Sequence, residues 1–340
     1  MPKTRSGALY GRFERPSSPE TTDGLTIYLV SDAVADAGRF GAGDPKRVAF
    51  FVLHLVGFVA HLIGWCLVLA EAELGARLQL WRMQAEHVTD FIGGSFVQMK
   101  VAPDLELQPA WIAFAWFMCS FLFHALVLVS WLCGTIDYWY FAGIRRCTGA
   151  WRWAEYTVSA SIMLLGASAL LGTRELRVVI ASTVSMGTTM FFGYLTEVNS
   201  QRHICCNGTR WDASLFECNR KVLERFLPHI MGYVPFVLSW WLALDSYYLA
   251  TDAFTASGAI VEDAGEALWA GFGLFMLFGS VQFVLLARHD GPEWYWLGEM
   301  AYVVLSVAAK FTMALILLYR GLTPERIAQA KTVDVVPACM

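Results

Sequence analysis

Six long runs of the chain contain no Asp, Glu, Lys or Arg, and this feature restricts the possible folds more than any other. The runs cover residues 48–70, 107–136, 156–173, 178–196, 226–244 and 267–287. Each is close to the roughly 20 residues that a helix needs to cross a bilayer. Backbone groups in lipid must be hydrogen-bonded internally, which only helices and closed barrels achieve, and the alternating pattern of barrel strands is absent. The runs therefore predict membrane-spanning helices.

A seventh span is predicted over 300–319, where Lys310 is the only charged residue. We expect an all-α membrane protein: a seven-helix bundle over residues 47–320, with tails at 1–46 and 321–340. Composition agrees, because 56% of the residues are hydrophobic, 16% are charged and the mean hydropathy is +0.48, outside the usual range of soluble domains. The lipid bilayer is thus the first expected partner. A net charge of -4, with the basic residues in short loops, argues against a nucleic-acid partner.

Seven spans place the two termini on opposite sides of the membrane, and the distribution of Lys and Arg indicates which is which. With the N-terminus in the cytoplasm, sixteen basic residues fall on the cytoplasmic side and eight on the other. We therefore expect a multi-pass protein with a cytoplasmic N-terminus and the C-terminus outside. Residues 1–46 contain no apolar core of signal-peptide length, so no cleaved leader is expected. The sequon at Asn207 would be glycosylated only in the opposite orientation.

The eight cysteines form neither a disulfide framework nor a zinc motif. Several lie inside apolar runs, where a thiol acts as a small hydrophobic group. Cys205, Cys206, Cys218 and His203 are close in sequence, but adjacent cysteines do not fit the usual zinc spacings. A reduced cytoplasmic loop is the favoured interpretation, and no metal site is predicted.

Lys310 is the residue that points to function. It lies ten residues from the start and nine from the end of its predicted span, too deep for its stem to reach an interface easily. An ionisable group at that depth is costly unless it is paired or modified. One interpretation is a structural lysine paired with a carboxylate. The other is chemical, because burial favours the neutral amine, which can form a Schiff base with an aldehyde.

A protonated Schiff base needs a counterion, and carboxylates within the predicted spans are rare. Glu155, at the start of the third predicted span, is the best candidate. A glutamate near a helix end is often merely interfacial. Arg152, Glu155 and Ser159, however, are spaced by three and four residues and so share one helix face. This spacing favours a role for Glu155 inside the bundle.

Two segments resemble the heliorhodopsin family of retinal proteins. The seventh span reads GEMAYVVLSVAAK from Gly298 to Lys310, with Ser306 four residues before the lysine, where most other microbial rhodopsins have Asp. The third span contains RWAEY followed by Ser159, similar to the family pattern RWxEY with Glu as the sole counterion. The resemblance covers about residues 46–320. The N-terminal tail and the 197–225 loop are longer than in typical members.

The resemblance implies that all-trans-retinal is bound to Lys310 in an internal pocket, with Glu155 as its counterion. Pocket roles are expected for Ser306, Ser159, Tyr156, Met186, Trp240, Phe275 and Phe278. A proton or polar network near the Schiff base is expected to contain His54, His124, Ser120, Arg152 and Glu299. His61, on the same helix face as His54, is an alternative for the role of His54. Aromatic residues and single histidines at helical spacing are, without the family, more often ordinary core.

The family likeness also implies a light-absorbing photoreceptor, not an enzyme, that acts in sensory transduction as a homodimer. Proton pumps rely on further carboxylates, yet Gly166 stands eleven residues after Glu155 and Ser306 replaces the seventh-helix Asp. Signalling without pumping, through an unidentified cytoplasmic partner, is therefore favoured. A light-gated proton or cation conductance is the alternative, kept open by Glu197, Glu299 and the two histidines. A receptor or transporter without a chromophore gives no reason for the Lys310 pattern.

Overall fold

Eight helices and one two-stranded sheet make up the described part of the chain. The structure, a computed structural model, describes residues 45–72, 74–75, 77–89, 95–145, 147–170, 173–204, 215–256, 264–287 and 292–317. All of them belong to the unit Pro45–Met340. The elements are α1 (Pro45–Glu71), β1 (Leu78–Thr89), β2 (Ser95–Leu107), α2 (Pro109–Leu132), α3 (Ile136–Arg145), α4 (Ala150–Leu170), α5 (Leu176–Ile204), α6 (Leu215–Ala256), α7 (Ala264–Ala287) and α8 (Pro292–Leu317).

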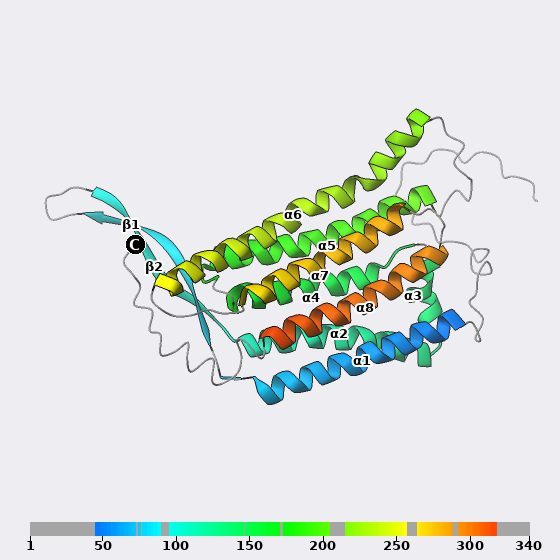
Figure 1. The fold of residues 1–340 in the computed structure, drawn as a ribbon, viewed down its shortest axis with the longest axis horizontal. Coiled ribbons are helices and arrows are strands. Elements are labelled where there is room, and N and C mark those ends of the chain that lie inside the picture. The colour runs from blue at the N-terminus through cyan, green and yellow to red at the C-terminus, as the bar shows by residue number, and fades with distance from the viewer. Residues whose placement is uncertain are drawn as a thin grey trace, which may run out of the picture. The chain divides into compact units, whose positions relative to one another are not determined.

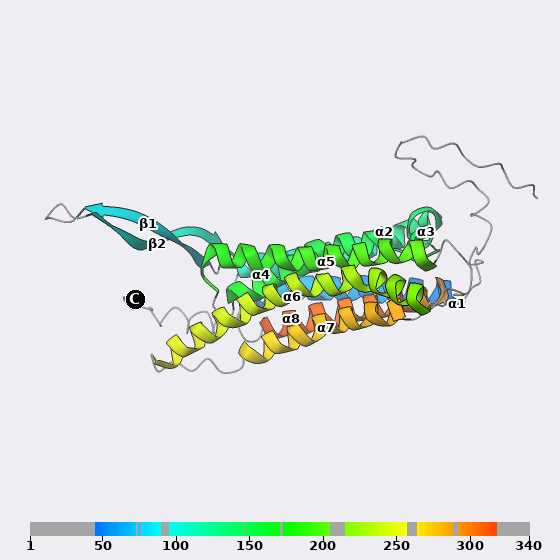
Figure 2. The ribbon, with the colours of Figure 1, turned by 90° about the horizontal axis from the view of Figure 1, so that it is seen from above.

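Seven of these helices run side by side as a bundle, and α3 is a short helix at one end (Figures 1 and 2). The helix α1 begins at the end where α3 lies, and α8 finishes at the opposite end (Figure 1). We call the end where α1 begins the Pro45 end. The odd number of long helices thus separates the two ends of the bundle segment, as the sequence predicts.

Six of the described helices are long and apolar enough to cross a membrane by length and composition: α1, α2, α5, α6, α7 and α8. The remaining long helix, α4, has 21 residues and contacts α2, α5, α6 and α8. Its sequence carries Arg152 and Glu155, and both side chains are buried inside the bundle. Both charges are paired inside the bundle, so they are compatible with a central place for α4.

Two predicted helix starts differ from the structure in a way that matters for the site. The third span, predicted from residue 156, begins at Ala150, and the seventh, predicted from residue 300, begins at Pro292. The charged residues Glu155 and Glu299 lie just before the two predicted starts, but a charge that finds partners inside a bundle does not end a helix. As a result Glu155 lies in the second turn of α4, and Glu299 lies in α8.

Local signals explain the limits of α2. Pro109 occupies its first position, where the missing N–H costs nothing and the fixed φ suits a helix. At the other end Gly134 has φ +69°, a conformation that favours glycine, and the N–H of Thr135 donates to the Ser130 carbonyl at 2.9 Å. This arrangement is a common helix C-terminus. The predicted run 107–136 therefore divides into α2 and the start of α3.

The antiparallel hairpin β1–β2 was not expected from the sequence. Its strands pair from Leu78 opposite Leu107 to Thr89 opposite Ser95, with a register shift between Leu80 and Trp81. The Trp81 N–H donates to the Arg174 carbonyl at 2.8 Å, which joins the hairpin to the α4–α5 connection. The hairpin lies at the end of the bundle opposite the Pro45 end (Figures 1 and 2).

The core of the bundle is apolar and aromatic around α4. Trp116, Tyr156, Met163 and Trp240 are among its buried members. Buried polar side chains interrupt it at two levels, around Lys310 and around Arg152. Those two levels carry the candidate functional groups.

Candidate functional site

The first buried group, which we call the Lys310 cluster, consists of Lys310, Glu155, Ser120 and Ser306. Lys310 is 3% exposed, and its Nζ lies 2.7 Å from Glu155 Oε1 and 2.9 Å from Ser306 Oγ. Nζ also donates to Ser120 Oγ, and the Ser120 hydroxyl donates to Glu155 Oε1 at 2.5 Å. Three helices, α2, α4 and α8, thus converge on one lysine amine.

The helical repeat explains why these side chains meet. Ser306 stands four residues before Lys310 in α8, so both project from one face. Glu155 and Ser159 have the same spacing in α4, and the buried Ser159 lies beside the Glu155 carboxylate. A buried ion pair is stable only when its remaining hydrogen-bonding capacity is used. The two serine hydroxyls meet that need at Lys310 Nζ.

An apolar cavity adjoins Lys310, between α4, α5, α7 and α8. Its lining consists of Tyr156, Ser159, Ala160, Met163, Met190, Phe275, Phe278, Ser306, Ala309 and Lys310. Six of the predicted pocket residues are therefore brought together in it, alongside Met163, Met190 and the two alanines. A second cavity between α5, α6 and α7 shares Met190, Phe275 and Phe278 with the first.

Two of the predicted pocket residues lie one layer away from this lining. Met186 is fully buried, but Met190, one turn later in α5, lines the cavity instead. Trp240 is 1% exposed and packs behind Phe275, with the ring centroids 5.7 Å apart. Met186 and Met190 share a helix face, so sequence spacing alone could not distinguish them.

The predicted histidines lie between α1 and α2. His54 Nδ1 and His124 Nδ1 are 2.9 Å apart, so one ring donates a hydrogen bond to the other. His61, considered an alternative to His54, is also fully buried, and its ring centroid is 5.2 Å from that of His124. The structure therefore places three histidines together where the sequence suggested two.

The second buried group, the Arg152 cluster, consists of Arg152, Glu197, Glu299 and Tyr295. The Arg152 guanidinium donates to Glu299 Oε1 through Nη1 and to Glu197 Oε1 through Nη2. Glu197 Oε2 accepts from the Tyr295 hydroxyl at 2.9 Å and from the Gly149 N–H at 2.8 Å. All three charged side chains are at most 6% exposed. Glu299 also lies 3.4 Å from the hydroxyl of Tyr140.

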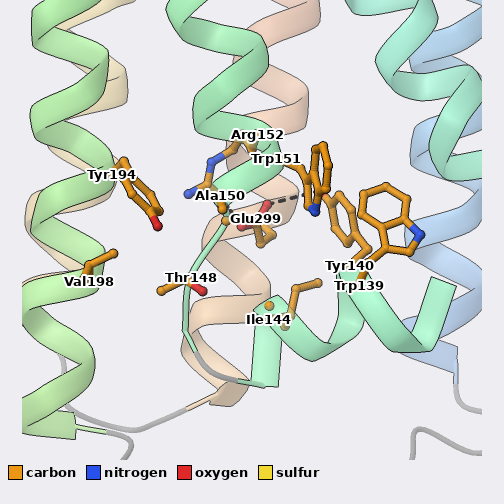
Figure 3. A pocket seen from close by; sticks show the side chains of 12 residues that line it. Trp139, Tyr140, Ile144, Thr148, Ala150, Trp151, Arg152, Tyr194, Val198 and Glu299 are labelled. Atoms are coloured by element: carbon orange, nitrogen blue, oxygen red, sulfur yellow. Dashed lines mark hydrogen bonds and ion pairs between the residues drawn. The ribbon is translucent and has the colours of Figure 1, made fainter. Parts of the chain in front are cut away.

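A cavity of about 310 Å³, lined by both polar and apolar side chains, opens beside the Arg152 cluster. Figure 3 shows Arg152 and Glu299 in the middle, with Tyr194 and Val198 on one side and Trp151 and Trp139 on the other. The cavity lies at the Pro45 end, because α4 and α8 begin there (Figure 1).

The predicted polar network is therefore divided in two. Ser120 belongs to the Lys310 cluster, and His124 belongs to the histidine group beside it, whereas Arg152 and Glu299 form a separate cluster. Glu299 precedes Lys310 by eleven residues in α8, which corresponds to about 16 Å along the helix axis. The sequence spacing predicted that Arg152 and Glu155 share one face of α4. In the structure, however, Arg152 pairs with Glu197 and Glu299, and Glu155 pairs with Lys310.

Several earlier expectations fall on residues that the structure leaves undescribed. Cys205, Cys206 and Asn207, and the side chains of His203 and Cys218, lie outside the described residues. Among the side chains that are described, no group of three or more His, Cys, Asp or Glu could hold a metal ion.

The chemistry of the residues around Lys310 suits the retinal group that the sequence resemblance implies. Lys310 is the one buried lysine among the described side chains, and its amine is the group that an aldehyde requires. The adjoining cavity is walled by apolar and aromatic side chains, as suits a hydrocarbon chain. A carboxylate at 2.7 Å stands ready to balance a positive charge on Nζ.

Comparison with known proteins agrees with this class of site. The chain is similar to a solved structure titled "Crystal structure of thermophilic rhodopsin", with a TM-score of 0.54 and 12% sequence identity over 85% of this chain and 96% of that chain. This likeness shows that the fold is a rhodopsin fold. No protein of curated function matches the chain.

The fold and the family comparison define a retinal protein of the rhodopsin class, a multi-pass integral membrane protein in contact with lipid. The sequence profile of the family described as Heliorhodopsin matches residues 79–322. The chain therefore belongs to the heliorhodopsin family, as the patterns around Glu155 and Lys310 suggested.

Proposed function

We propose that this chain is a photoreceptor, not an enzyme, with all-trans-retinal bound to Lys310 and Glu155 as its sole counterion. The observation that carries the proposal is the Lys310–Glu155 pair, 2.7 Å apart, beside an apolar cavity. When bound, retinal supplies visible absorption and light-driven isomerisation. Met163, Met190, Phe275 and the other side chains of that cavity would hold it.

The side chains of the Lys310 cluster stabilise a positive charge at Lys310 Nζ. Glu155 provides the opposite charge, and Ser120 and Ser306 provide hydroxyl oxygens at Nζ. Burial strengthens each of these interactions, since little water competes for the charges. The cluster thereby favours a proton at Nζ in the dark and gives that proton nearby acceptors.

Signalling without active pumping is the mode of action that we favour. A pump needs groups that exchange protons in sequence on both sides of the membrane. At Gly166, a position where a second carboxylate would serve, an added Cβ would lie 3.0 Å from Ile112 and 3.2 Å from Trp116. This crowding leaves little room for a carboxylate at position 166, which supports the absence of a proton relay through this part of α4. A cytoplasmic partner would then receive the signal.

The direct test is reconstitution of the purified protein with all-trans-retinal. We expect a visible absorption band to form, and light to produce a reversible change in that band. A mixture that shows only the spectrum of free retinal would contradict the proposal.

A light-gated proton or cation conductance is the second candidate, favoured by the Arg152 cluster and its cavity. Glu197 and Glu299 are buried at the Pro45 end, next to a cavity whose lining includes Arg152 and Glu299. Voltage-clamp recording under illumination separates the candidates. No photocurrent at any potential supports signalling, and a current that reverses with the ion gradient supports conductance. A current that persists against the gradient would contradict both.

We further propose that the Pro45 end faces the cytoplasm, on the basis of the sixteen-to-eight division of basic residues. Epitope tags at the two ends should show only the C-terminal tag on intact cells and both tags after permeabilisation. Glycosylation at Asn207 would indicate the reverse orientation. The family likeness also supports a homodimer, which sedimentation of the detergent-solubilised protein would test.

A further inference from the structure

The three histidines between α1 and α2, His54, His61 and His124, differ in the groups that surround them. His54 is packed against the rings of Phe50 and Tyr140 and bonds to His124. His61 instead packs against Phe311, the residue after Lys310 in α8, with the ring centroids 6.4 Å apart, and it faces the charges of Lys310 and Glu155. His124 lies between the other two histidines and is also within reach of Lys310. His61 is therefore closely linked to the Lys310 cluster, and His54 adjoins it through His124.

The hydrogen bonds of His61 determine which of its nitrogens can accept a proton. Its Nδ1 lies 2.6 Å from the Gly57 carbonyl oxygen. A carbonyl only accepts, so Nδ1 must carry the hydrogen, and the neutral ring has its lone pair at Nε2. Nε2 is buried without a hydrogen-bond partner among the described residues. An unsatisfied acceptor in a buried polar site is a place where a proton or an ordered water binds.

The charges around His61 can change so that protonation of its ring becomes more favourable. From α8, a positive Lys310 opposes a second positive charge on the ring, and from α4, the Glu155 carboxylate attracts one. The neighbouring His54 of α1 and His124 of α2 add no negative charge. Loss of the proton from Lys310 Nζ removes the opposing charge and leaves the attraction of Glu155. His61 then becomes a better proton site than it was before.

We propose that His61 is the residue that accepts the proton released from Lys310 Nζ. The N–H bond at Nζ breaks and leaves a neutral nitrogen, an N–H bond forms at His61 Nε2, and Glu155 stays an anion throughout. The total charge of the three groups is unchanged, and one ion pair replaces another. Because no described residue lies within hydrogen-bond distance of His61 Nε2, the transfer runs through a bridging water, as general bases can use. This inference rests on the proposed photoreceptor function.

The packing around Gly57 supports a specific arrangement of these rings. A Cβ at Gly57 would lie 2.7 Å from the His124 ring, so glycine is needed for His124 to approach α1. The same residue supplies the carbonyl that fixes His61. One position of α1 therefore holds both His124 and His61 next to the Lys310 cluster.

The first measurement concerns the tautomer and needs no chromophore. Nitrogen-15 NMR of histidine-labelled protein without retinal, with His61→Asn to assign the signal, should show His61 as the Nδ1–H tautomer. A neutral His61 with its hydrogen at Nε2 would overturn the inference, whether or not the protein proves to be a photoreceptor.

The second measurement follows proton transfer after a flash of light in two matched variants. His61→Asn keeps a donor for the Gly57 carbonyl but removes the base, and His54→Asn is the same change two turns earlier in α1. We expect loss of the Nζ proton to slow at least about tenfold in His61→Asn, equivalent to about 1.4 kcal/mol, and to change less than about twofold in His54→Asn.

A light-induced imidazolium signal in the infrared difference spectrum should be present in the unchanged protein and absent in His61→Asn. A larger effect in His54→Asn would assign the proton to the His54–His124 pair and overturn the inference. Equal kinetics in all three proteins, with a protonated carboxyl signal, would assign it to Glu155 and also overturn it. Failure to bind retinal at all would instead contradict the proposed function.

Discussion

The two buried charge clusters share the helices α4 and α8, but only one of them contains a cation that can lose its proton. The helix α4 contributes Glu155 to the Lys310 cluster and Arg152 to the Arg152 cluster, and α8 contributes Lys310 to one and Glu299 to the other. An arginine stays charged in proteins, whereas a lysine amine can give up its proton. The Arg152 cluster is therefore suited to a permanent structural role, and the Lys310 cluster to a reversible one.

The partners of the two cations support the same distinction. Arg152 is held by two carboxylates, and one of them also accepts from Tyr295 and Gly149. Lys310 has one carboxylate and two serine hydroxyls, and a hydroxyl can both donate and accept. The neighbourhood of Lys310 can thus rearrange after a proton moves, while the two carboxylates beside Arg152 hold a cation that keeps its charge. Both clusters are buried, so burial alone does not make a site functional.

The largest expected effect is the loss of colour when the Lys310 amine is removed. Lys310→Ala should produce a folded protein that gains no visible band with all-trans-retinal, because the linkage needs a primary amine. Lys310→Arg is the matched control for charge, since it keeps a cation beside Glu155, and it should be equally colourless. Circular dichroism checks the helical content. A visible band in either variant would show that another group holds the chromophore.

The next largest effect is expected on stability at the Arg152 cluster. Arg152→Ala leaves two buried carboxylates without their cation and should lower the free energy of unfolding by about 3–5 kcal/mol. Arg177→Ala, an exposed arginine of α5, should change it by less than about 0.5 kcal/mol. Unfolding in detergent, followed by circular dichroism, measures both. Equal stability of the two variants would mean that the Arg152 cluster is not structural.

A smaller and more specific effect is expected when each cluster loses one carboxylate. Glu155→Gln should shift the absorption band to longer wavelength or remove the proton from Lys310 Nζ, because the carboxylate stabilises a positive Nζ most strongly in the dark state. Glu299→Gln, about 16 Å away along α8, should leave the band nearly unchanged. Absorption spectra of the two variants measure both effects. Identical spectra for Glu155→Gln and the unchanged protein would assign the counterion elsewhere.

The smallest effect is expected at Ser120. Ser120→Ala removes one hydroxyl that bridges Nζ and Glu155, which should cost about 1 kcal/mol and shift the band less than Glu155→Gln does. Thr188→Ala is the control, since the Thr188 hydroxyl donates to the Val184 carbonyl of its own helix, away from the Lys310 cluster. A shift as large as that of Glu155→Gln would show that Ser120, and not the carboxylate alone, controls the charge at Nζ.

The amino-acid sequence by itself determined the class of fold and the central pair of residues. Apolar runs of membrane-spanning length predicted the long helices, since each run must satisfy its own backbone in lipid. The depth of Lys310, Ser306 one turn before it, and the RWAEY pattern around Glu155 indicated the candidate site. These signals are local, because they depend only on helix length and on which residues share a helix face.

Only the tertiary structure decided which partners those residues meet. It brought Glu197 of α5 and Glu299 of α8 onto one arginine, and it placed Met190 and not Met186 in the cavity wall. It also paired β1 with β2 and set His61 near Lys310. Such contacts join residues far apart in the chain, and they depend on the rotation and packing of whole helices, which spacing within one helix does not contain.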